Sequence, residues 1–220
     1  MRAGRTVDDF VTLKDLAATF LEAGGVKPPA TMDARSLMPQ LLAEKSGVVD
    51  PTRDAAIFGR ERHVPNARED NLPYPARAIR TKDFLYIRNF KPDRYPFGDP
   101  RAKWKLAGPG DELSNASFSD MDASLTKSWL IDHRQEEAGK AFFEIAFGKR
   151  PAEELYDLRK DPQQMHNLAT SPEHQTVLKQ LSARLLKVQQ DTRDPRFEDA
   201  FDQSPYIERD KNLKATPETM

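Results

Sequence analysis

The sequence predicts an α+β fold, in which a small antiparallel sheet packs against helices. Strand-like segments in the middle of the chain follow one another through hairpin-type connections, without the β-α-β crossovers of a parallel sheet. Towards both ends, apolar residues recur at the i, i+3, i+4 spacing of amphipathic helices. The chain has 220 residues, of which 38% are hydrophobic, and this supplies enough apolar side chains for a core.

The first predicted helix covers residues 7–21. Thr6 and Asp9 resemble a capping box at its start, and the pair Gly24-Gly25 ends it. The residues on its predicted apolar face are Phe10, Leu13, Leu16, Ala17, Phe20 and Leu21. A single amphipathic helix buries its apolar face only against other elements, so we expect the natural protein to continue upstream. A second, shorter helix is expected around residues 36–42.

The strands are predicted between residues 55 and 158. Residues 55–58 are typical of a buried strand, and a proline-containing loop follows over 64–75. Residues 77–80 and 84–89, joined by the polar turn 81–83, predict an antiparallel hairpin. Four prolines and three glycines in residues 91–120 indicate an irregular surface segment. Residues 154–158 predict the last strand.

Helical pieces are predicted before and after that strand. Apolar residues between 123 and 147 indicate helical pieces, although the middle of this stretch is highly charged. Ser171 and Pro172 predict the start of a final helix. Its apolar side comprises Leu178, Leu181, Leu185 and Val188. Residues 191–220 are polar, contain three prolines and predict an extended tail. The chain therefore divides into residues 1–50, 51–190 and 191–220.

The composition excludes several classes of function. Lys and Arg number 34 and Asp and Glu number 35, so no global charge favours nucleic acid or an anionic membrane as a partner. The absence of cysteine excludes disulfides, thiolate zinc sites and a cysteine nucleophile within these residues. No apolar run reaches the length of a signal peptide or the ~20 residues of a membrane span. We expect a soluble chain without a membrane partner.

Two motifs resemble the sulfatase family. Residues 154–169, ELYDLRKDPQQMHNLA, are similar to the "ELYDL-x-x-DP-x-E-x-x-NL" signature near the C-terminus of sulfatases, and depart from it at Gln164. The predicted first helix and residues 33–41 resemble the family's "D-x-x-PT-x-L-x-x-AG" and "DG-x-SL-x-P-x-L" segments. They depart at residues 17–19, where the usual proline is missing, and at Ala34, which replaces glycine.

A third stretch is more discriminating. Residues 59–63, 74–80 and 86–90 resemble the branch that contains the heparan N-sulfatases (N-sulfoglucosamine sulfohydrolases) and their bacterial relatives. The resemblance covers residues 5–195 with gaps. It implies hydrolysis of sulfate esters or sulfamates, with sulfated sugars such as glycosaminoglycans as substrates, and an alkaline-phosphatase-like fold. It also implies that residues 1–50 end a large catalytic α/β domain and that residues 51–190 form the C-terminal subdomain.

The resemblance further implies that the catalytic groups lie elsewhere. The family's nucleophile is a formylglycine made within a C/S-x-P-x-R motif, and its calcium binds Asp and Asn side chains of the large domain. This chain has no cysteine, and none of its serines is followed two residues later by proline. We therefore expect no catalytic residue and no metal ligand here, and calcium only in the parent enzyme. The expected partner is the missing N-terminal catalytic domain, and the chain alone should be inactive. The resemblance also implies a periplasmic, secreted or lysosomal location.

Five residues are candidates for substrate binding: Arg60, Glu61, His63, Arg77 and Arg80. An imidazole at a loop entrance and a carboxylate can pair with sulfate or sugar hydroxyls, and a guanidinium can bind an anion bidentately. If the strand persisted to residue 63, Glu61 and His63 would share one face and Arg60 and Arg62 the other. The alternative is that His63 is a surface or packing residue and that the arginines form ordinary salt bridges across the hairpin. The remaining histidines have no companion at metal-ligand spacing.

Two other functions stay open. The parent could be a phosphatase or phosphodiesterase of the same superfamily, which a Thr or unmodified Ser nucleophile with two zinc ligands upstream would favour. The chain could also be a non-catalytic module that binds a carbohydrate or a protein partner. The sequence upstream of Met1 would discriminate between these alternatives.

Overall fold

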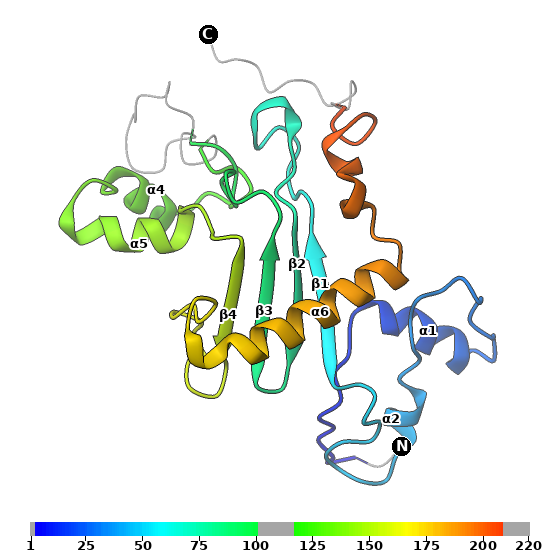
Figure 1. Ribbon diagram of the computed structural model, residues 1–220. Coiled ribbons are helices and arrows are strands. Elements are labelled where there is room, and N and C mark those ends of the chain that lie inside the picture. Colours follow the sequence, from blue (N-terminus) through cyan, green and yellow to red (C-terminus); the bar gives the residue numbers. More distant parts are fainter. Residues whose placement is uncertain (1–2, 101–116, 209–220) are drawn as a thin grey trace.

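The computed structural model describes residues 3–100 and 117–208. Within them lies a four-stranded antiparallel sheet in the order β1-β2-β3-β4 (Figure 1). Its strands are β1 (Ala55–Arg60), β2 (Ala76–Thr81), β3 (Phe84–Asn89) and β4 (Glu153–Asp157). The hairpin of β2 and β3 and the last strand are confirmed. With helices on the sheet, the predicted α+β class is confirmed as well.

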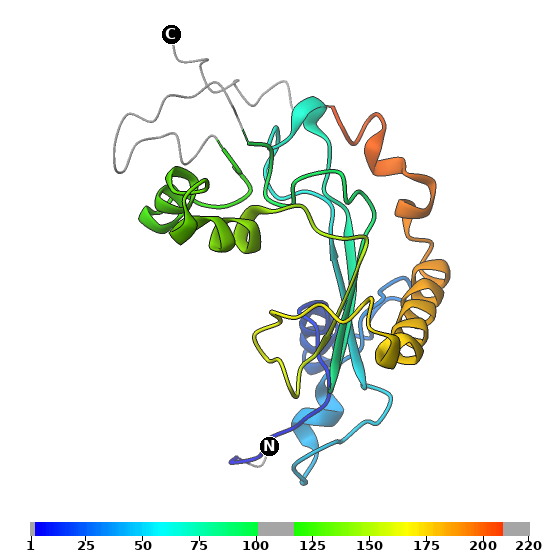
Figure 2. The same ribbon diagram turned by 60° about the vertical axis from the view of Figure 1, so that its left-hand side comes forward.

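The main core lies between the sheet and helix α6 (Gln175–Asp191). Ile79 of β2 pairs with Tyr86 of β3, and Tyr86 pairs with Leu155 of β4, so the three side chains share one face of the sheet. The helix contributes the residues that the helical spacing predicted: Leu178, Leu181 and Leu185. The helix crosses this face of the sheet (Figure 1). Seen edge-on, α6 lies on the opposite side of the sheet from two other helices, α4 (Leu125–Asp132) and α5 (Glu137–Phe147) (Figure 2).

Strand β1 is an edge strand that pairs only with β2 among the described strands. The side chain of Phe58 is 51% exposed, so the prediction of a buried strand is wrong at this position. Beyond β1, the loop to β2 contains the short 3₁₀ helix η1 (Glu69–Asn71). The segment is otherwise irregular, as the prolines of residues 64–75 predicted.

The two predicted helices at the N-terminal end are α1 (Lys14–Ala23) and α2 (Met38–Leu42). The start predicted at residue 7 is wrong, because residues 7–9 bind the segment at 47–50 instead. Val7 forms a bridge with Gly47, and the Asp9 carboxylate accepts hydrogen bonds from the backbone of Val49 and Asp50. These contacts hold the residues ahead of α1 out of a helical conformation.

The buried side of α1 is also different from the prediction. The buried residues are Asp15, Ala18 and Thr19, whereas Leu13 is 87% exposed and Phe20 is 69% exposed. The polar side chains are bound from inside the protein: Arg53 forms an ion pair of 2.8 Å with Asp15, and the Thr19 hydroxyl accepts a hydrogen bond from the Leu37 backbone. The apolar face of α1 is therefore left on the surface of this chain.

A second layer is made by α4 (Leu125–Asp132) and α5 (Glu137–Phe147). Both lie in the region where helical pieces were predicted. Their core contains Phe118, Ile131 and Phe147, of which Phe147 is fully buried. The irregular segment predicted at 91–120 is only partly described, since residues 101–116 lie outside the described residues.

The C-terminal part begins with η2 (Pro172–His174), which leads directly into α6. After α6 come η3 (Pro195–Glu198) and η4 (Ala200–Asp202). The predicted extended tail is therefore wrong for these residues, because they form short helical turns that lie against the end of the sheet, and residues 209–220 lie outside the described part. None of the helices in the described residues is long and apolar enough to cross a membrane.

Candidate functional site

The strand register separates the five predicted substrate-binding residues into two groups. Gly59 pairs with Arg77, and Arg60 with Ala76, so Arg60, Glu61 and Arg77 lie at one end of the sheet. Arg80 pairs with Ala56, near the start of β1. Arg80 lies three positions after Arg77 in β2, which corresponds to about 10 Å along the strand and puts the two side chains on opposite faces. The structure therefore does not bring Arg80 to the other candidates.

Glu61 and Arg77 are parts of a network of charges, buried at Arg196 and partly exposed at its edge, which we name the arginine–carboxylate cluster. Arg77 donates to both oxygens of Asp194, with distances of 2.6 Å from Nε and 2.9 Å from Nη2. The same guanidinium lies 2.7 Å from the Glu61 carboxylate. Glu61 also receives a hydrogen bond from Arg196, whose side chain is 0% exposed. The members of the cluster are Glu61, Arg77, Lys91, Arg94, Asp194, Arg196, Asp199 and Asp202.

Gly59 makes room for this arrangement. A Cβ atom at Gly59 would lie 2.5 Å from Cδ of Arg77 and 2.8 Å from the carbonyl oxygen of Ala76. The Arg77 side chain thus runs across the backbone of β1, its cross-strand neighbour, towards Glu61 and Asp194. A residue without a side chain is required at this point of the strand.

The contacts of the cluster shift the pKa values of Asp194 and Arg77 towards the charged forms. Burial acts to raise the pKa of Asp194, but hydrogen bonds from Arg77, Arg196 and Gln189 outweigh burial and hold this pKa below its ordinary value. Burial likewise acts to lower the pKa of Arg77, and its bonds to Asp194 and Glu61 raise it above the ordinary value. Both shifts favour the ionised pair of Arg77 and Asp194.

The cluster fixes the chain after α6 to the sheet. Asp194 also caps η3, because its carboxylate accepts a hydrogen bond from the Arg196 backbone. Arg196 reaches Asp202 at 2.7 Å, and Arg94 reaches Asp202 at 2.6 Å. Glu61 and Arg77, which were both predicted to bind substrate, thus form ion pairs with charged side chains of the protein itself. For Arg77 this agrees with the alternative of a salt bridge, although its partners lie after β1 and after α6 and not across the β2–β3 hairpin.

The other candidates have different surroundings. Strand β1 ends at Arg60, so the alternation of faces does not extend to His63. Arg60 donates to the carbonyl of Pro96 and lies over the ring of Phe97, 5.3 Å from its centroid. His63 and Arg80 are exposed, and neither side chain has a hydrogen bond or ion pair with another described residue. Of the five, these two therefore remain available to a ligand.

A second buried ion pair lies under the same loop. Arg68 and Asp120 are 2.8 Å apart, with side chains 2% and 0% exposed. Asp120 also accepts a hydrogen bond from the Val64 backbone, and Arg68 donates to the carbonyls of Tyr95 and Pro96. These bonds join the loop after β1 to the segment after β3. They give the loop that bears His63 a fixed conformation.

Sequence reasoning missed the C-terminal half of the cluster. Asp194, Arg196 and Asp202 lie within a polar stretch that was predicted to be an extended tail. One local signal was present: Asp194 precedes Pro195, and an aspartate before a proline is typical of the start of a helical turn. The long-range pairing with Glu61 and Arg77 has no signal in the spacing of residues, because more than 100 positions separate the partners.

No metal site is formed by the part of the chain that the structure describes. Within residues 3–100 and 117–208, no group of three or more His, Cys, Asp or Glu side chains has the arrangement to hold a metal ion. The carboxylates that do gather, those of the cluster, are bound by Arg or Lys. These residues do not fit a calcium site.

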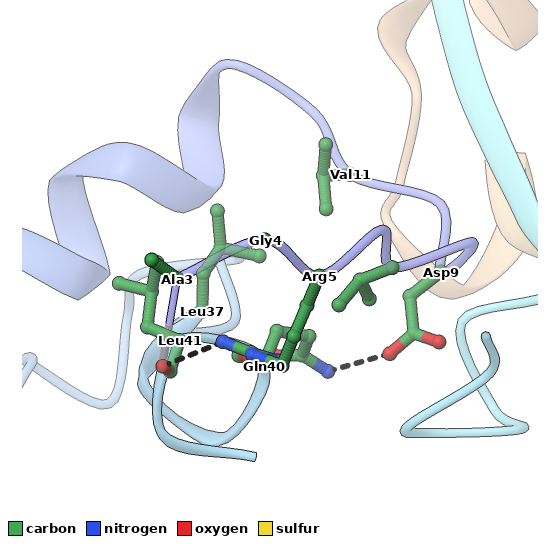
Figure 3. Close-up of a pocket in the computed structure, with 9 residues that line it drawn as sticks. Ala3, Gly4, Arg5, Asp9, Val11, Leu37, Gln40 and Leu41 are labelled. Atoms are coloured by element: carbon green, nitrogen blue, oxygen red, sulfur yellow. Dashed lines mark hydrogen bonds between the residues drawn. The ribbon is translucent and has the colours of Figure 1, made fainter. Parts of the chain in front are cut away.

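A groove lies at the other end of the molecule, between residues 3–11 and α2. Its volume is about 460 Å³, and most of its lining is apolar (Figure 3). Gln40 lines it, and its side-chain amide donates to the buried Asp9 at 2.8 Å. The Oε1 atom of Gln40 is buried and has no hydrogen-bond partner. The groove thus combines apolar walls with one unsatisfied acceptor.

Comparison with known proteins identifies the class of the chain. No family model matches it. The ulvan-active sulfatase of Formosa agariphila is 27% identical over 181 residues, which cover 82% of this chain and 29% of that protein. The human N-sulphoglucosamine sulphohydrolase is 26% identical over 209 residues, covering 88% of this chain and 35% of that protein. The chain is a homologue of the sulfatases and corresponds to a C-terminal portion of them.

The chain is also similar to a further sulfatase over a short segment, and to solved sulfatase structures at low identity. A segment of 58 residues is 42% identical to the extracellular sulfatase SULF-1 homolog of Drosophila melanogaster, and covers 26% of this chain. Among solved structures, BT1596, a 2-O GAG sulfatase, aligns with 84% of this chain at 19% identity and a TM-score of 0.47. BT4656 with D-glucosamine-2-N,6-O-disulfate aligns with 87% at 19% identity and a TM-score of 0.45. The chain spans about a third or less of the length of the curated relatives that match most of it.

Proposed function

We propose that this chain forms the C-terminal part of an enzyme that hydrolyses sulfate esters or sulfamates of sulfated sugars. The observation that carries the proposal is the match to sulfatases over more than four-fifths of the chain. The names of two relatives, an ulvan-active sulfatase and an N-sulphoglucosamine sulphohydrolase, describe enzymes that act on sulfated carbohydrates. They support the substrate class. The location that we propose is outside the cytoplasm, in the periplasm, the lysosome or the medium.

The catalytic groups are proposed to come from polypeptide outside this chain. Sulfate transfer requires a strong nucleophile and positive charge at the non-bridging oxygens. The chain has no cysteine and no serine two residues before a proline, and its described carboxylates do not fit a calcium site. An N-terminal catalytic domain would supply both groups. Its existence is consistent with the match to only 29–35% of the length of the two relatives.

The role of this chain would then be to form one wall of the sugar-binding cleft. His63 is the best candidate for a contact with substrate, because it is exposed and lies on a loop that the Arg68–Asp120 pair fixes. A protonated imidazole there would attract a sulfate group, and a neutral one would bind a sugar hydroxyl. Glu61 and Arg77 would act indirectly, since their charges hold the C-terminal segment against the sheet.

Two measurements test the proposal. The coding sequence upstream of Met1 should contain a C/S-x-P-x-R motif, and its absence would contradict the proposal. The purified 220-residue chain should show no turnover of a chromogenic aryl sulfate, with or without added calcium. Hydrolysis by this chain that is lost in His63→Ala would show that the catalytic groups lie within it, and the assignment to a non-catalytic wall would be wrong.

A further inference from the structure

The last described residues of the chain lie against the loop between β1 and β2 (residues 61–75), which bears His63, as both views show (Figures 1 and 2). We infer that residues 194–208, which we name the C-terminal strap, hold this loop in the shape that presents His63 to the sulfated sugar. Asn71 is the positioning residue through which the strap acts. The inference rests on the proposed function, and it names what fixes the proposed substrate contact.

The strap is bound at two places. At its start, Asp194 and Arg196 belong to the arginine–carboxylate cluster, in which Arg196 binds Glu61 at the beginning of the loop. Near its end, the backbone carbonyl of Tyr206 accepts a hydrogen bond from Nη2 of Arg62 at 2.6 Å. The two residues that directly precede the histidine are therefore both held by the strap.

Asn71 joins the strap to the inside of the loop, and it is 2% exposed. Its Nδ2 atom donates to the carbonyls of Ile207 at 3.1 Å and Glu208 at 3.3 Å. Its Oδ1 atom accepts a hydrogen bond from the Asn66 backbone at 2.9 Å, and its own carbonyl accepts one from Arg62 at 2.6 Å. Only this orientation of the amide pairs each donor with an acceptor, so both of its halves are used.

The loop depends on these contacts because its backbone departs from the locally preferred conformations. Asn66, Asp70 and Asn71 have φ angles of 60°, 52° and 56°. Asn and Asp adopt this left-handed region more readily than other L residues, but each such residue still costs free energy. Three of them between residues 66 and 71 persist only where the surrounding contacts over-determine the shape.

His63 takes its place from its neighbours in the chain, because its own side chain is exposed. Arg62, before it, is bound to the carbonyl of Asn71 and to the strap. The backbone N–H of Val64, after it, donates to the buried Asp120 at 2.8 Å. Release of the strap would free one of these two sides. The imidazole would then be less well ordered before it meets a sulfate or a hydroxyl, and binding would weaken.

The substitution Asn71→Asp tests the inference. Aspartate keeps an acceptor for the Asn66 backbone and tolerates a positive φ, but it places a carboxylate oxygen against two carbonyls of the strap, where a donor is needed. The matched control is Asn167→Asp. Asn167 likewise accepts from a backbone N–H, that of Leu155 at 2.9 Å, and donates to a carbonyl, that of Glu153 at 3.1 Å, but it lies in the loop after β4.

Two quantities are measured on both variants of the 220-residue chain. Hydrogen exchange with mass spectrometry reports on residues 62–72 and, as a reference, on β3. The NMR signal of the His63 ring, identified with His63→Ala, reports the binding of an N-sulfated glucosamine disaccharide. We expect Asn71→Asp to speed exchange in residues 62–72 at least about tenfold and to weaken binding at least about fivefold, and Asn167→Asp to change neither.

Two shortened chains guard against an effect of the substitution on folding. A chain that ends at Glu208 keeps the strap. A chain that ends at Gln203 lacks the carbonyls that Arg62 and Asn71 bind, but it retains the arginine–carboxylate cluster. The first should behave as the full chain, and the second should reproduce the effects of Asn71→Asp. Asn71→Asp should add little in the chain that ends at Gln203, because the contact is already lost there.

The outcomes separate this inference from the proposed function. If the disaccharide does not shift the His63 signal of the unaltered chain at concentrations up to about 50 mM, the proposed wall of the cleft is wrong, and the role of the strap is refuted with it. If the signal shifts, and the affinity is the same in Asn71→Asp and in the chain that ends at Gln203, the strap is refuted and the proposed function stands. Faster exchange without weaker binding would show a purely structural contact and would also overturn the inference.

Discussion

Replacing Arg196 by methionine should weaken the attachment of the C-terminal segment to the sheet. The Arg196 side chain is fully buried and forms ion pairs with Glu61, Asp199 and Asp202. Methionine retains most of the apolar stem of arginine and removes the charge, so the packing of the neighbours is least disturbed. The variant therefore isolates the loss of one central cation.

The expected magnitude follows from what remains around the carboxylates. Removing one partner of a buried ion pair costs about 3–5 kcal/mol when the other charge is left uncompensated. Here Glu61 keeps Arg77 at 2.7 Å and Asp202 keeps Arg94 at 2.6 Å, and the two acidic side chains are 20% and 12% exposed. This compensation reduces the expected loss to about 2–3 kcal/mol of unfolding free energy. For a chain of this size the melting temperature should fall by about 4–10 °C.

The assay is urea unfolding followed by circular dichroism, with limited proteolysis of the native protein as a local probe. Cleavage after Arg193 should become faster in Arg196→Met, because the segment that starts at Asp194 would detach more often. The matched control is Arg184→Met. Its pair with Asp54 has side chains 41% and 55% exposed and should contribute less than about 1 kcal/mol. If Arg196→Met lost no more stability than Arg184→Met, the cluster would not hold the segment, and our assignment of its role would be wrong.

Two further perturbations act on the same cluster. Burial acts to raise the pKa of Asp194, but hydrogen bonds, chiefly from Arg77, hold it below its ordinary value. The stabilisation that the ionised Asp194 gives to the folded chain is therefore complete above about pH 4, and it is lost as the pH falls through the folded-state pKa. In Asp194→Asn the unfolding free energy should consequently vary less with pH in this acidic range, and an unchanged slope would contradict the pairing. Gly59→Ala should cost about 1–3 kcal/mol, because the new Cβ would meet Arg77 Cδ at 2.5 Å. The cost should shrink in an Arg77→Ala background, and equal costs in both backgrounds would place the clash elsewhere.

Local patterns were sufficient to predict most of the sheet and its covering helix. The turn at 81–83 and the flanking alternation predict β2 and β3, and the spacing of Leu178, Leu181 and Leu185 predicts the buried side of α6. The hydrogen bonds of the β2–β3 hairpin and those within α6 form in short stretches of chain, and the apolar spacing of α6 marks the side that packs on the sheet. Their sequences therefore contain the information that specifies them.

The candidate site was predicted less well, because its partners are far apart in the sequence. Arg77 was predicted to bind a carboxylate or sulfate of the substrate, whereas in the structure it binds the carboxylate of Asp194, which is 117 positions away. No periodicity connects the two residues, and the segment after α6 has too few apolar residues to indicate that it is packed. The charges alone do not show whether they bind each other or a ligand until the backbone has brought them together.

The first helix is present, but its buried side was predicted wrongly. Its apolar spacing is real, and a stripe such as Leu13, Leu16 and Phe20 normally marks the side that a helix buries. In this chain the fold buries Asp15 and Thr19 instead, since Arg53 and the Leu37 backbone bind them. The apolar spacing therefore marks α1 as a helix but does not decide which of its sides this chain buries, because the buried side is set by polar partners that lie 18 to 38 positions away.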